Sequence, residues 1–164
     1  MILYIIRHGI AVDRDAPKAP PEAERPLTAR GIQKTRLAAV GLKGMGVKPD
    51  VLITSPFVRA AQTAKIFAEA VGFPLEKIRV SDHLKPNANP SDIEKELQKL
   101  RIKEVMCFGH APHVDLWISY LAGARGDFTE LKKAGVASFE YEPHRAKWKL
   151  LWLLTPKILR SFAD

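Results

Sequence analysis

Near its start the sequence reads Ile2-Leu3-Tyr4-Ile5-Ile6-Arg7-His8-Gly9, an apolar run that ends at two polar residues and a glycine. The run is rich in β-branched residues and lacks the polar alternation of a strand with one solvated face. Such a pattern is typical of a central parallel strand that helices cover on both faces. These residues therefore predict an α/β fold, with polar side chains at the end of a buried strand.

Similar apolar runs alternate with helical patterns along the rest of the chain. Alternating strands and helices predict a mostly parallel central sheet with helices on both faces, a three-layer α/β/α arrangement. Two final strands, at 136–141 and 148–154, are expected to form a β-hairpin across the turn at 142–147. The other predicted strands span 50–54, 78–80 and 104–109, and the predicted helices span 28–43, 56–71, 91–100 and 112–121.

Three of these helices have recognisable N-terminal caps, and Ser55 before Pro56 is the one for the second helix. Thr28 precedes the first helix, and Ser91 with Glu94 has the spacing of a capping box for the third. A helix in a layered fold buries the apolar residues that share one face. For the first helix, this face is expected to contain Ile32, Leu37, Val40 and Leu42.

The composition is that of one compact domain. With 164 residues and 46% hydrophobic content the chain can bury a core of its own, and we expect residues 1–164 to form a single domain. Cys107 is the only cysteine and lies in an apolar run, which predicts a buried thiol and no intrachain disulfide. Neither a signal peptide nor a membrane-spanning run is recognisable. We therefore expect a cytoplasmic location and no membrane partner.

The formal net charge of +8 would favour an anionic partner. Nucleic acid, an acidic lipid surface, a phosphorylated small molecule and an acidic protein face all meet this condition. The basic residues are spread through the chain, and the longest uninterrupted run is the pair Lys132-Lys133. The charge alone does not choose among these partners, and a solvated basic surface is the simpler interpretation.

Polar residues gather where the predicted strands end. The first strand ends in Arg7-His8-Gly9, Ser55-Pro56 and Arg59 follow the second, and the strand at 104–109 ends in Gly109-His110. Ligands of parallel α/β sheets bind at the carboxyl ends of the strands. We therefore expect two arginines and two histidines to meet in one crevice.

Side chains of this kind are suited to phosphoryl transfer. A neutral imidazole can attack phosphorus, while guanidinium groups bind the phosphoryl oxygens and stabilise the charge of the transition state. Gly9 allows the backbone to approach the anion, and helices beginning near Pro56 and Pro112 would add their positive ends. No third ligand at a zinc-type spacing accompanies His110 and His113. The set thus predicts phosphoryl transfer that requires no metal, and no cofactor is expected.

The same residues resemble known motifs. Arg7-His8-Gly9, the stretch from Ser55 to Thr63 and Gly109-His110 are similar to three ordered motifs of the histidine phosphatase superfamily. Within it, Arg25-Pro26-Leu27-Thr28 and Trp152-Leu153-Leu154-Thr155-Pro156 resemble the SixA-type phosphohistidine phosphatases. The resemblance spans nearly the whole chain and implies a fold like that of phosphoglycerate mutase.

The resemblance also implies residue roles. His8 would be the transiently phosphorylated nucleophile, and Arg7, Arg59 and His110 would surround the phosphoryl group. His110 would be protonated when phosphate is bound. The implied substrate is phosphohistidine on a protein, which makes a phosphorylated protein the expected partner.

The motifs do not identify the proton donor for the leaving group. Larger relatives use a carboxylate, and we prefer Glu22 because its loop follows the nucleophile and precedes the Arg25-Pro26 motif. His83 occupies a region where relatives often place the acid. A phosphohistidine substrate needs less help, since imidazole leaves more readily than an alkoxide. The candidates are Asp13, Asp15, Glu22, Glu24, Asp82 and His83.

Two other functions stay open from the sequence. A small-molecule phosphomonoesterase on the same fold would act on a small phosphorylated metabolite, because the four pocket residues recognise phosphate rather than its carrier. A non-catalytic anion-binding or nucleic-acid-binding module would draw on the net charge. The presence of both histidines and both arginines argues against that module, so no nucleic-acid partner is expected. His113, one turn after His110, is expected to border the pocket or to face solvent.

Overall fold

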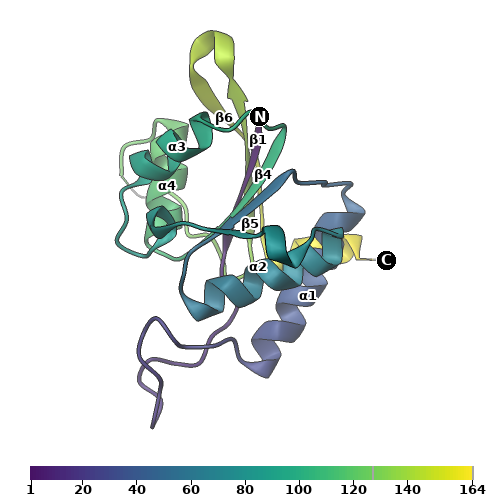
Figure 1. The fold of residues 1–164 in the computed structure, drawn as a ribbon, viewed down its shortest axis with the longest axis vertical. Helices are drawn as coiled ribbons and strands as arrows, with labels where there is room; N and C mark the ends of the chain where they lie inside the picture. Colours follow the sequence, from purple (N-terminus) through teal and green to yellow (C-terminus); the bar gives the residue numbers. More distant parts are fainter. Residues whose placement is uncertain (127, 164) are drawn as a thin grey trace.

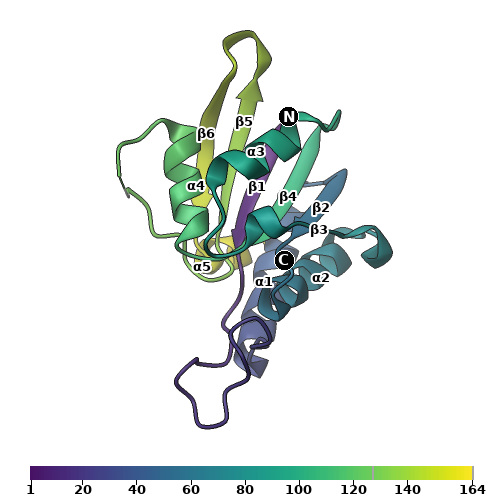
Figure 2. The same ribbon diagram turned by 60° about the vertical axis from the view of Figure 1, so that its left-hand side comes forward.

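The computed structural model describes residues 1–126 and 128–163, and its centre is a six-stranded sheet in the order β3-β2-β4-β1-β5-β6 (Figures 1 and 2). β1 to β4 run parallel, while β5 and β6 form an antiparallel hairpin beside β1. The mostly parallel sheet and the terminal hairpin are thus confirmed. The strands are β1 Ile2–Arg7, β2 Val51–Thr54, β3 Arg79–Val80, β4 Glu104–Gly109, β5 Val136–Glu142 and β6 Lys147–Leu154; the α-helices are α1 Ala29–Gly44, α2 Val58–Val71, α3 Pro90–Gln98, α4 His113–Ala122 and α5 Pro156–Leu159.

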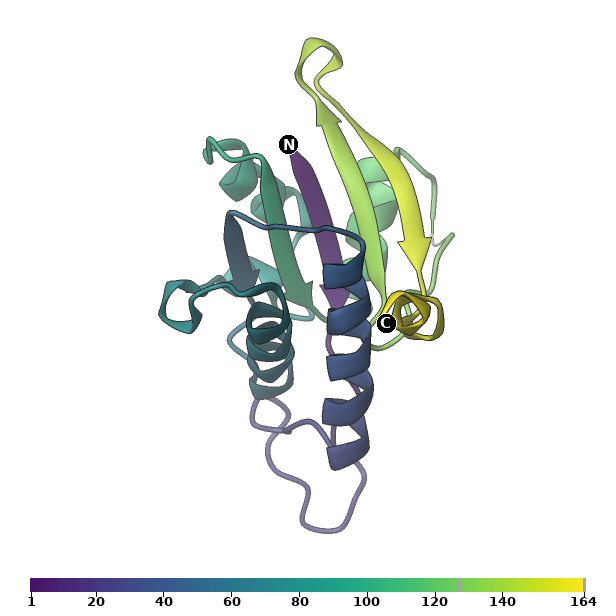
Figure 3. The same cartoon turned by 90° about the vertical axis from the view of Figure 1, so that its right-hand side faces the viewer.

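Helices cover both faces of the sheet, which gives the predicted three layers. α3 and α4 pack on one face, and α1, α2 and α5 pack on the other (Figure 3). Along β1, Leu3 and Ile5 belong to the first core, whereas Tyr4 and Ile6 belong to the second. Both faces of the strand are therefore buried, which explains why it is apolar at successive positions. Cys107 is buried in the first core as predicted.

The face that α1 buries differs from the predicted stripe. Leu37 and Val40 are exposed, whereas Ala38 is fully buried. A Cβ atom on Gly41 would lie only 1.8 Å from the carbonyl oxygen of Leu159 in α5. The helix thus approaches neighbouring backbone too closely for large side chains. The predicted stripe is confirmed at Leu42 and Ile32, which pack in the second core, and is wrong at Leu37 and Val40, because close packing here requires small residues.

The N-terminal cap of α3 also differs from the prediction. The Asn89 side chain accepts a hydrogen bond from the backbone of Ser91, and the helix begins at Pro90. Asparagine is as good a cap as serine, and proline suits the first helical position, so the helix begins before the predicted capping box. Thr28, by contrast, caps α1 as predicted, because its hydroxyl accepts from the backbone of Gly31.

The carboxyl ends of β1, β2 and β4 lie at one edge of the sheet. The long connection from residue 8 to residue 28 projects from this edge in all three ribbon views (Figures 1, 2 and 3). The turn of the β5–β6 hairpin lies at the opposite end of the sheet, because Glu140 is in register with Ile2 at the start of β1. Among the described helices, none has the length and apolar character needed to cross a membrane.

Candidate active site

Parallel pairing places the ends of three strands next to one another. Arg7 at the end of β1 is in register with Gly109 of β4, and Thr54 at the end of β2 is in register with Phe108. The residues that follow these ends are the ones that the sequence singled out. The structure therefore brings the two arginines and two histidines of the predicted crevice together.

His8 is held as a neutral imidazole in one tautomer. Its Nδ1 lies 2.7 Å from the carbonyl oxygen of Gly9 and must be the donor, because a carbonyl only accepts. Its Nε2 then carries a lone pair and accepts a hydrogen bond from Nε of Arg59 at 3.1 Å. Burial is the main cause that lowers the pKa of His8 to about 3, and the charges of Arg59, Arg7 and Lys133 act in the same direction. The Nε2 lone pair is therefore free of a proton at neutral pH.

Thr63 joins the first and second motifs. Its hydroxyl accepts a hydrogen bond from the backbone of Gly9 at 3.0 Å and donates to the carbonyl oxygen of Arg59 at 2.7 Å. Gly9 also has to be a glycine, since a Cβ atom there would lie 2.2 Å from Oγ1 of Thr35. The spacing of Arg59 and Thr63 on one face of α2 thus fixes the backbone that orients the His8 ring.

Arg59 is almost fully buried in the first turn of α2 and is shared between His8 and Glu22. Its Nη1 donates to the Glu22 carbonyl oxygen at 2.6 Å, and its Nη2 donates to the Glu22 carboxylate at 2.7 Å. Arg25 holds the same carboxylate with two hydrogen bonds of 2.7 and 2.8 Å. The hydrogen bonds from Arg25 are the main cause that lowers the pKa of Glu22, and Arg59 adds to it. Glu22 is therefore a carboxylate in the free protein.

His110 lies beside His8, with ring centroids 5.1 Å apart. Its Nε2 is 2.8 Å from the Ser55 hydroxyl, which also accepts from the backbone of Phe57. Burial is the main cause that lowers the pKa of His110 to about 2, and its electrostatic interactions with His8 and Arg59 act in the same direction. The ring is neutral in the free protein, and a bound phosphate dianion would raise its pKa by favouring the charged form.

Arg7 is oriented by a backbone segment far away in the sequence. Its Nη1 donates to the carbonyl oxygen of Leu131 at 2.8 Å, and the backbone N–H of Leu131 donates to the Asp115 carboxylate at 2.7 Å. Asp115 lies in the first turn of α4. The sequence analysis did not find Asp115, because a contact between a side chain and a distant backbone leaves no local pattern.

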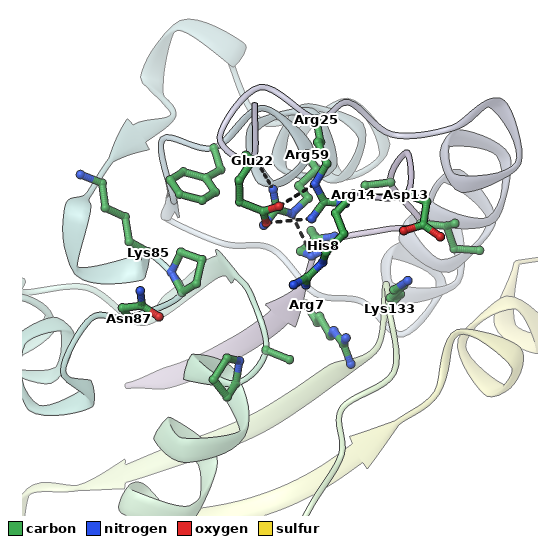
Figure 4. A pocket seen from close by; sticks show the side chains of 16 residues that line it. Arg7, His8, Asp13, Arg14, Glu22, Arg25, Arg59, Lys85, Asn87 and Lys133 are labelled. Carbon is green, nitrogen blue, oxygen red and sulfur yellow. Dashed lines mark hydrogen bonds and ion pairs between the residues drawn. The ribbon is translucent and has the colours of Figure 1, made fainter. Parts of the chain in front are cut away.

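Three of the four predicted residues, Arg7, His8 and Arg59, line one cleft of about 730 Å³ (Figure 4), whereas His110 is buried beside His8 and is not among the lining residues. The connection at 8–28, the start of α2, residues 85–87 and Lys133 supply its walls. This volume is typical of sites that hold a whole small molecule, so the cleft has room for the carrier of a phosphoryl group.

The candidate proton donors in the first loop separate into two groups. Asp13 and Glu22 line the cleft. Asp15 and Glu24 are exposed and are not among the residues that line it. The loop therefore presents two of its four acidic candidates to the site.

The two candidates after β3 are engaged outside the cleft. Asp82 forms an ion pair with Lys85 at 2.9 Å, and Nδ1 of His83 lies 3.0 Å from the Glu96 carboxylate. Lys85, and not Asp82 or His83, lines the cleft. This geometry favours the first loop as the source of a donor.

His113 meets neither expectation from the sequence. It is fully buried, and its ring centroid lies 6.1 Å from that of Trp117. Neither ring nitrogen has a hydrogen-bond partner among the described residues, and burial lowers the pKa of His113 to about 4. The physical reason is that the first turn of α4 packs tightly over Gly109, so the residue three positions after His110 points inward.

Comparison with known proteins agrees with the motifs. The model of the histidine phosphatase superfamily (branch 1) matches residues 3–85. Phosphohistidine phosphatase SixA of Escherichia coli (strain K12) is 32% identical over 124 residues, which cover 74% of each protein. An uncharacterised protein of Picosynechococcus sp. is 34% identical over 140 residues, covering 83% of this chain and 82% of its own length.

Solved structures show the same fold. The protein histidine phosphatase SixA in complex with tungstate superposes with a TM-score of 0.86 at 27% identity, covering 97% of this chain and 99% of its own. A mutant phosphoserine phosphatase from Entamoeba histolytica in complex with phosphoserine has a TM-score of 0.74 at 16% identity, covering 95% and 98%. The first match confirms the predicted α/β fold. The second match shows a similar fold and carries no information on function.

Proposed function

The chain belongs to the histidine phosphatase superfamily, and from this membership we propose that it is a phosphohistidine phosphatase that forms a phosphorylated intermediate on His8. Phosphatase activity follows from the family. The intermediate is supported by one observation above others. Nε2 of a buried, neutral His8 carries its lone pair beside the guanidinium group of Arg59.

In the first step, the Nε2 lone pair of His8, released from its hydrogen bond with Nε of Arg59, attacks phosphorus and the bond from phosphorus to the leaving group breaks. Arg7, Arg59 and His110 bind the phosphoryl oxygens and stabilise the spreading charge. Positive charge develops on the His8 ring, and the hydrogen bond from Nδ1 to the Gly9 carbonyl oxygen stabilises it. The leaving group takes up a proton as it departs.

In the second step, a water molecule attacks the phosphorus of phosphorylated His8. The bond from phosphorus to Nε2 breaks, its electron pair returns to the ring, and inorganic phosphate leaves with the oxygen and both protons of the water. His8 regains its neutral form because the proton on Nδ1 never moves. Burial favours this form, which makes His8 both a competent nucleophile and a good leaving group.

Glu22 stays our candidate for the proton donor, but its ion pairs must weaken before its carboxylate can take up a proton. The phosphoryl oxygens would compete with its carboxylate for Nη2 of Arg59. Displacement from Arg59 toward a phosphate dianion would raise the pKa of Glu22, because the favourable charge is lost and a like charge is gained. Because the hydrogen bonds from Arg25 are the main cause that lowers this pKa, they too would have to be released before Glu22 could hold a proton to donate.

The leaving groups of the two possible substrates differ in how much protonation they need, and this difference supports phosphohistidine over an alkyl phosphate. Imidazole departs with modest protonation, so a donor held as a carboxylate is tolerable. The alternative is a small-molecule phosphomonoesterase, and the volume of the cleft, about 730 Å³, is the observation in its favour. Phosphoserine phosphatase has a related fold, so the fold does not decide between the two.

A side-by-side assay tests the substrate. We expect a higher kcat/KM for a phosphohistidine peptide than for a phosphoserine peptide or sugar phosphates, with excess EDTA present throughout. In the described part of the chain, no group of three or more histidine, cysteine or acidic side chains could hold a metal ion. Activity that is lost in EDTA and restored by a divalent cation would contradict a metal-independent mechanism, and a higher kcat/KM for a sugar phosphate would overturn the substrate.

The variant Glu22→Gln belongs in the same assay. If Glu22 donates a proton, Glu22→Gln should slow the hydrolysis of a phosphoserine peptide by about 10- to 100-fold, and that of a phosphohistidine peptide by only about a few-fold. Glu24→Gln is the matched control, because Glu24 is exposed in the same loop. Equal losses on both substrates would contradict the donor role.

A further inference from the structure

The cleft contains more positive charge than a phosphoryl group requires. Six cationic and two acidic side chains line it. A phosphoryl group brings at most about two negative charges at neutral pH. The cations are Arg7, Arg14, Arg25, Arg59, Lys85 and Lys133, and the acidic residues are Asp13 and Glu22.

Among the cations that line the cleft, Arg14 and Lys133 are the two with no partner within the described part of the chain. Neither forms an ion pair with a carboxylate within residues 1–126 and 128–163. The other four cations of the cleft are engaged in fixed contacts. These contacts join Arg25 and Arg59 to Glu22, Lys85 to Asp82, and Arg7 to the Leu131 carbonyl oxygen.

Arg14 and Lys133 come from separate segments and lie on the same side of the site. Arg14 belongs to the connection at 8–28, and Lys133 precedes β5. In the view of Figure 4, both are drawn on the opposite side of His8 from Lys85 and Asn87. Both are exposed, and both lie close enough to influence charged groups of the site. The cleft thus has, on one side of the nucleophile, two exposed cations that no carboxylate of the described residues pairs with.

We propose that Arg14 and Lys133 bind carboxylates that flank the phosphorylated histidine on an acidic protein surface. The inference rests on the proposed phosphohistidine phosphatase function and specifies its partner. Exposed, long cationic side chains suit a protein face, because they steer association through long-range charge and adapt to a variable surface. A small anionic metabolite is instead fixed by a few well-placed polar groups within an enclosing pocket.

Two phosphohistidine peptides that differ only in charge test this docking role. One carries glutamates on both sides of the phosphohistidine, and the other carries glutamines at the same positions. For the unmodified enzyme we expect a kcat/KM about 3- to 10-fold higher on the glutamate peptide, the effect of one or two exposed ion pairs. The ratio between peptides should fall toward one in Arg14→Gln/Lys133→Gln and in high salt.

The ratio is the readout because it cancels any general effect of a substitution on turnover. Lys149→Gln is the matched control, since Lys149 is exposed at the far end of the sheet and should keep the ratio of the unmodified enzyme. A ratio of one in the unmodified enzyme, or a high ratio that survives loss of both cations, would overturn the docking role while phosphohistidine hydrolysis stands. If neither peptide is cleaved faster than a phosphoserine peptide, the proposed function itself fails.

Discussion

At the residue scale, buried imidazoles determine both the chemistry and the acid sensitivity of this protein. His8, His110 and His113 have pKa values lowered to about 3, 2 and 4, and burial is the largest cause for each. For His8 and His110, the neutral form suits the proposed reaction. His113 has no role in the proposed reaction. The stability that its buried neutral ring takes from the folded state at low pH therefore serves no function.

We therefore expect the free energy of unfolding to fall as the pH drops below 6.5. The unfolded chain takes up protons on these histidines from about pH 6.5, whereas the folded chain resists protonation down to the lowered pKa values. Each histidine should contribute a slope of up to about 1.4 kcal/mol per pH unit. The variant His113→Leu lacks one of these contributions. Between pH 7.5 and pH 5, its free energy of unfolding should therefore fall by about 2 kcal/mol less than that of the unmodified protein.

Urea unfolding at the two pH values measures this difference. His144→Leu is the control, because His144 is exposed in the hairpin turn and should leave the pH dependence unchanged. An equal pH dependence for His113→Leu and the unmodified protein would show that the buried His113 ring does not resist protonation.

At the element scale, α4 positions Arg7 through the segment that leads into β5. Asp115 holds the backbone of Leu131, whose carbonyl oxygen accepts from Arg7. We expect Asp115→Ala to weaken inhibition by tungstate or inorganic phosphate about 10-fold, the effect of losing one well-oriented hydrogen bond to a charged group. Asp115→Asn should keep most of the affinity for these anions, because its amide oxygen can still accept the hydrogen bond from the backbone N–H of Leu131.

A double-mutant cycle separates positioning from a general loss of stability. If Asp115 acts through Arg7, Asp115→Ala should cost little anion affinity once Arg7 is already alanine. Asp92→Ala, which removes an exposed carboxylate on α3, is the control and should not change anion affinity. Additive losses in the double variant would contradict the positioning role.

Elements with strong local signals could be predicted from the sequence. β4 matches its predicted bounds, because a strand buried on both faces is apolar along its whole length. The face of α1 could be predicted only in part, since Leu42 is buried as predicted while the close approach of Gly41 to the backbone of α5 leaves no local pattern. The same holds for Asp115, whose partner is the backbone of a distant segment.

At the scale of the whole molecule, the order of the strands in the sheet brings together site residues that lie far apart in the sequence. Residues near 8, 59 and 110 could be predicted to meet, because each follows a parallel strand. Arg14 and Lys133 could not, since isolated cations in loops have no pattern that places them at a cleft. A single domain over residues 1–164 and a cytoplasmic location both stay predictions.

The phosphorylated His8 intermediate is the central claim, and rapid quenching during turnover of a ³²P-labelled phosphohistidine peptide tests it. The account predicts label on the protein that is lost in acid, survives in base and maps to the peptide containing His8. His8→Ala should show neither label nor turnover, with a circular dichroism spectrum like that of the unmodified protein. Turnover by a folded His8→Ala variant, or label on another residue, would contradict the account.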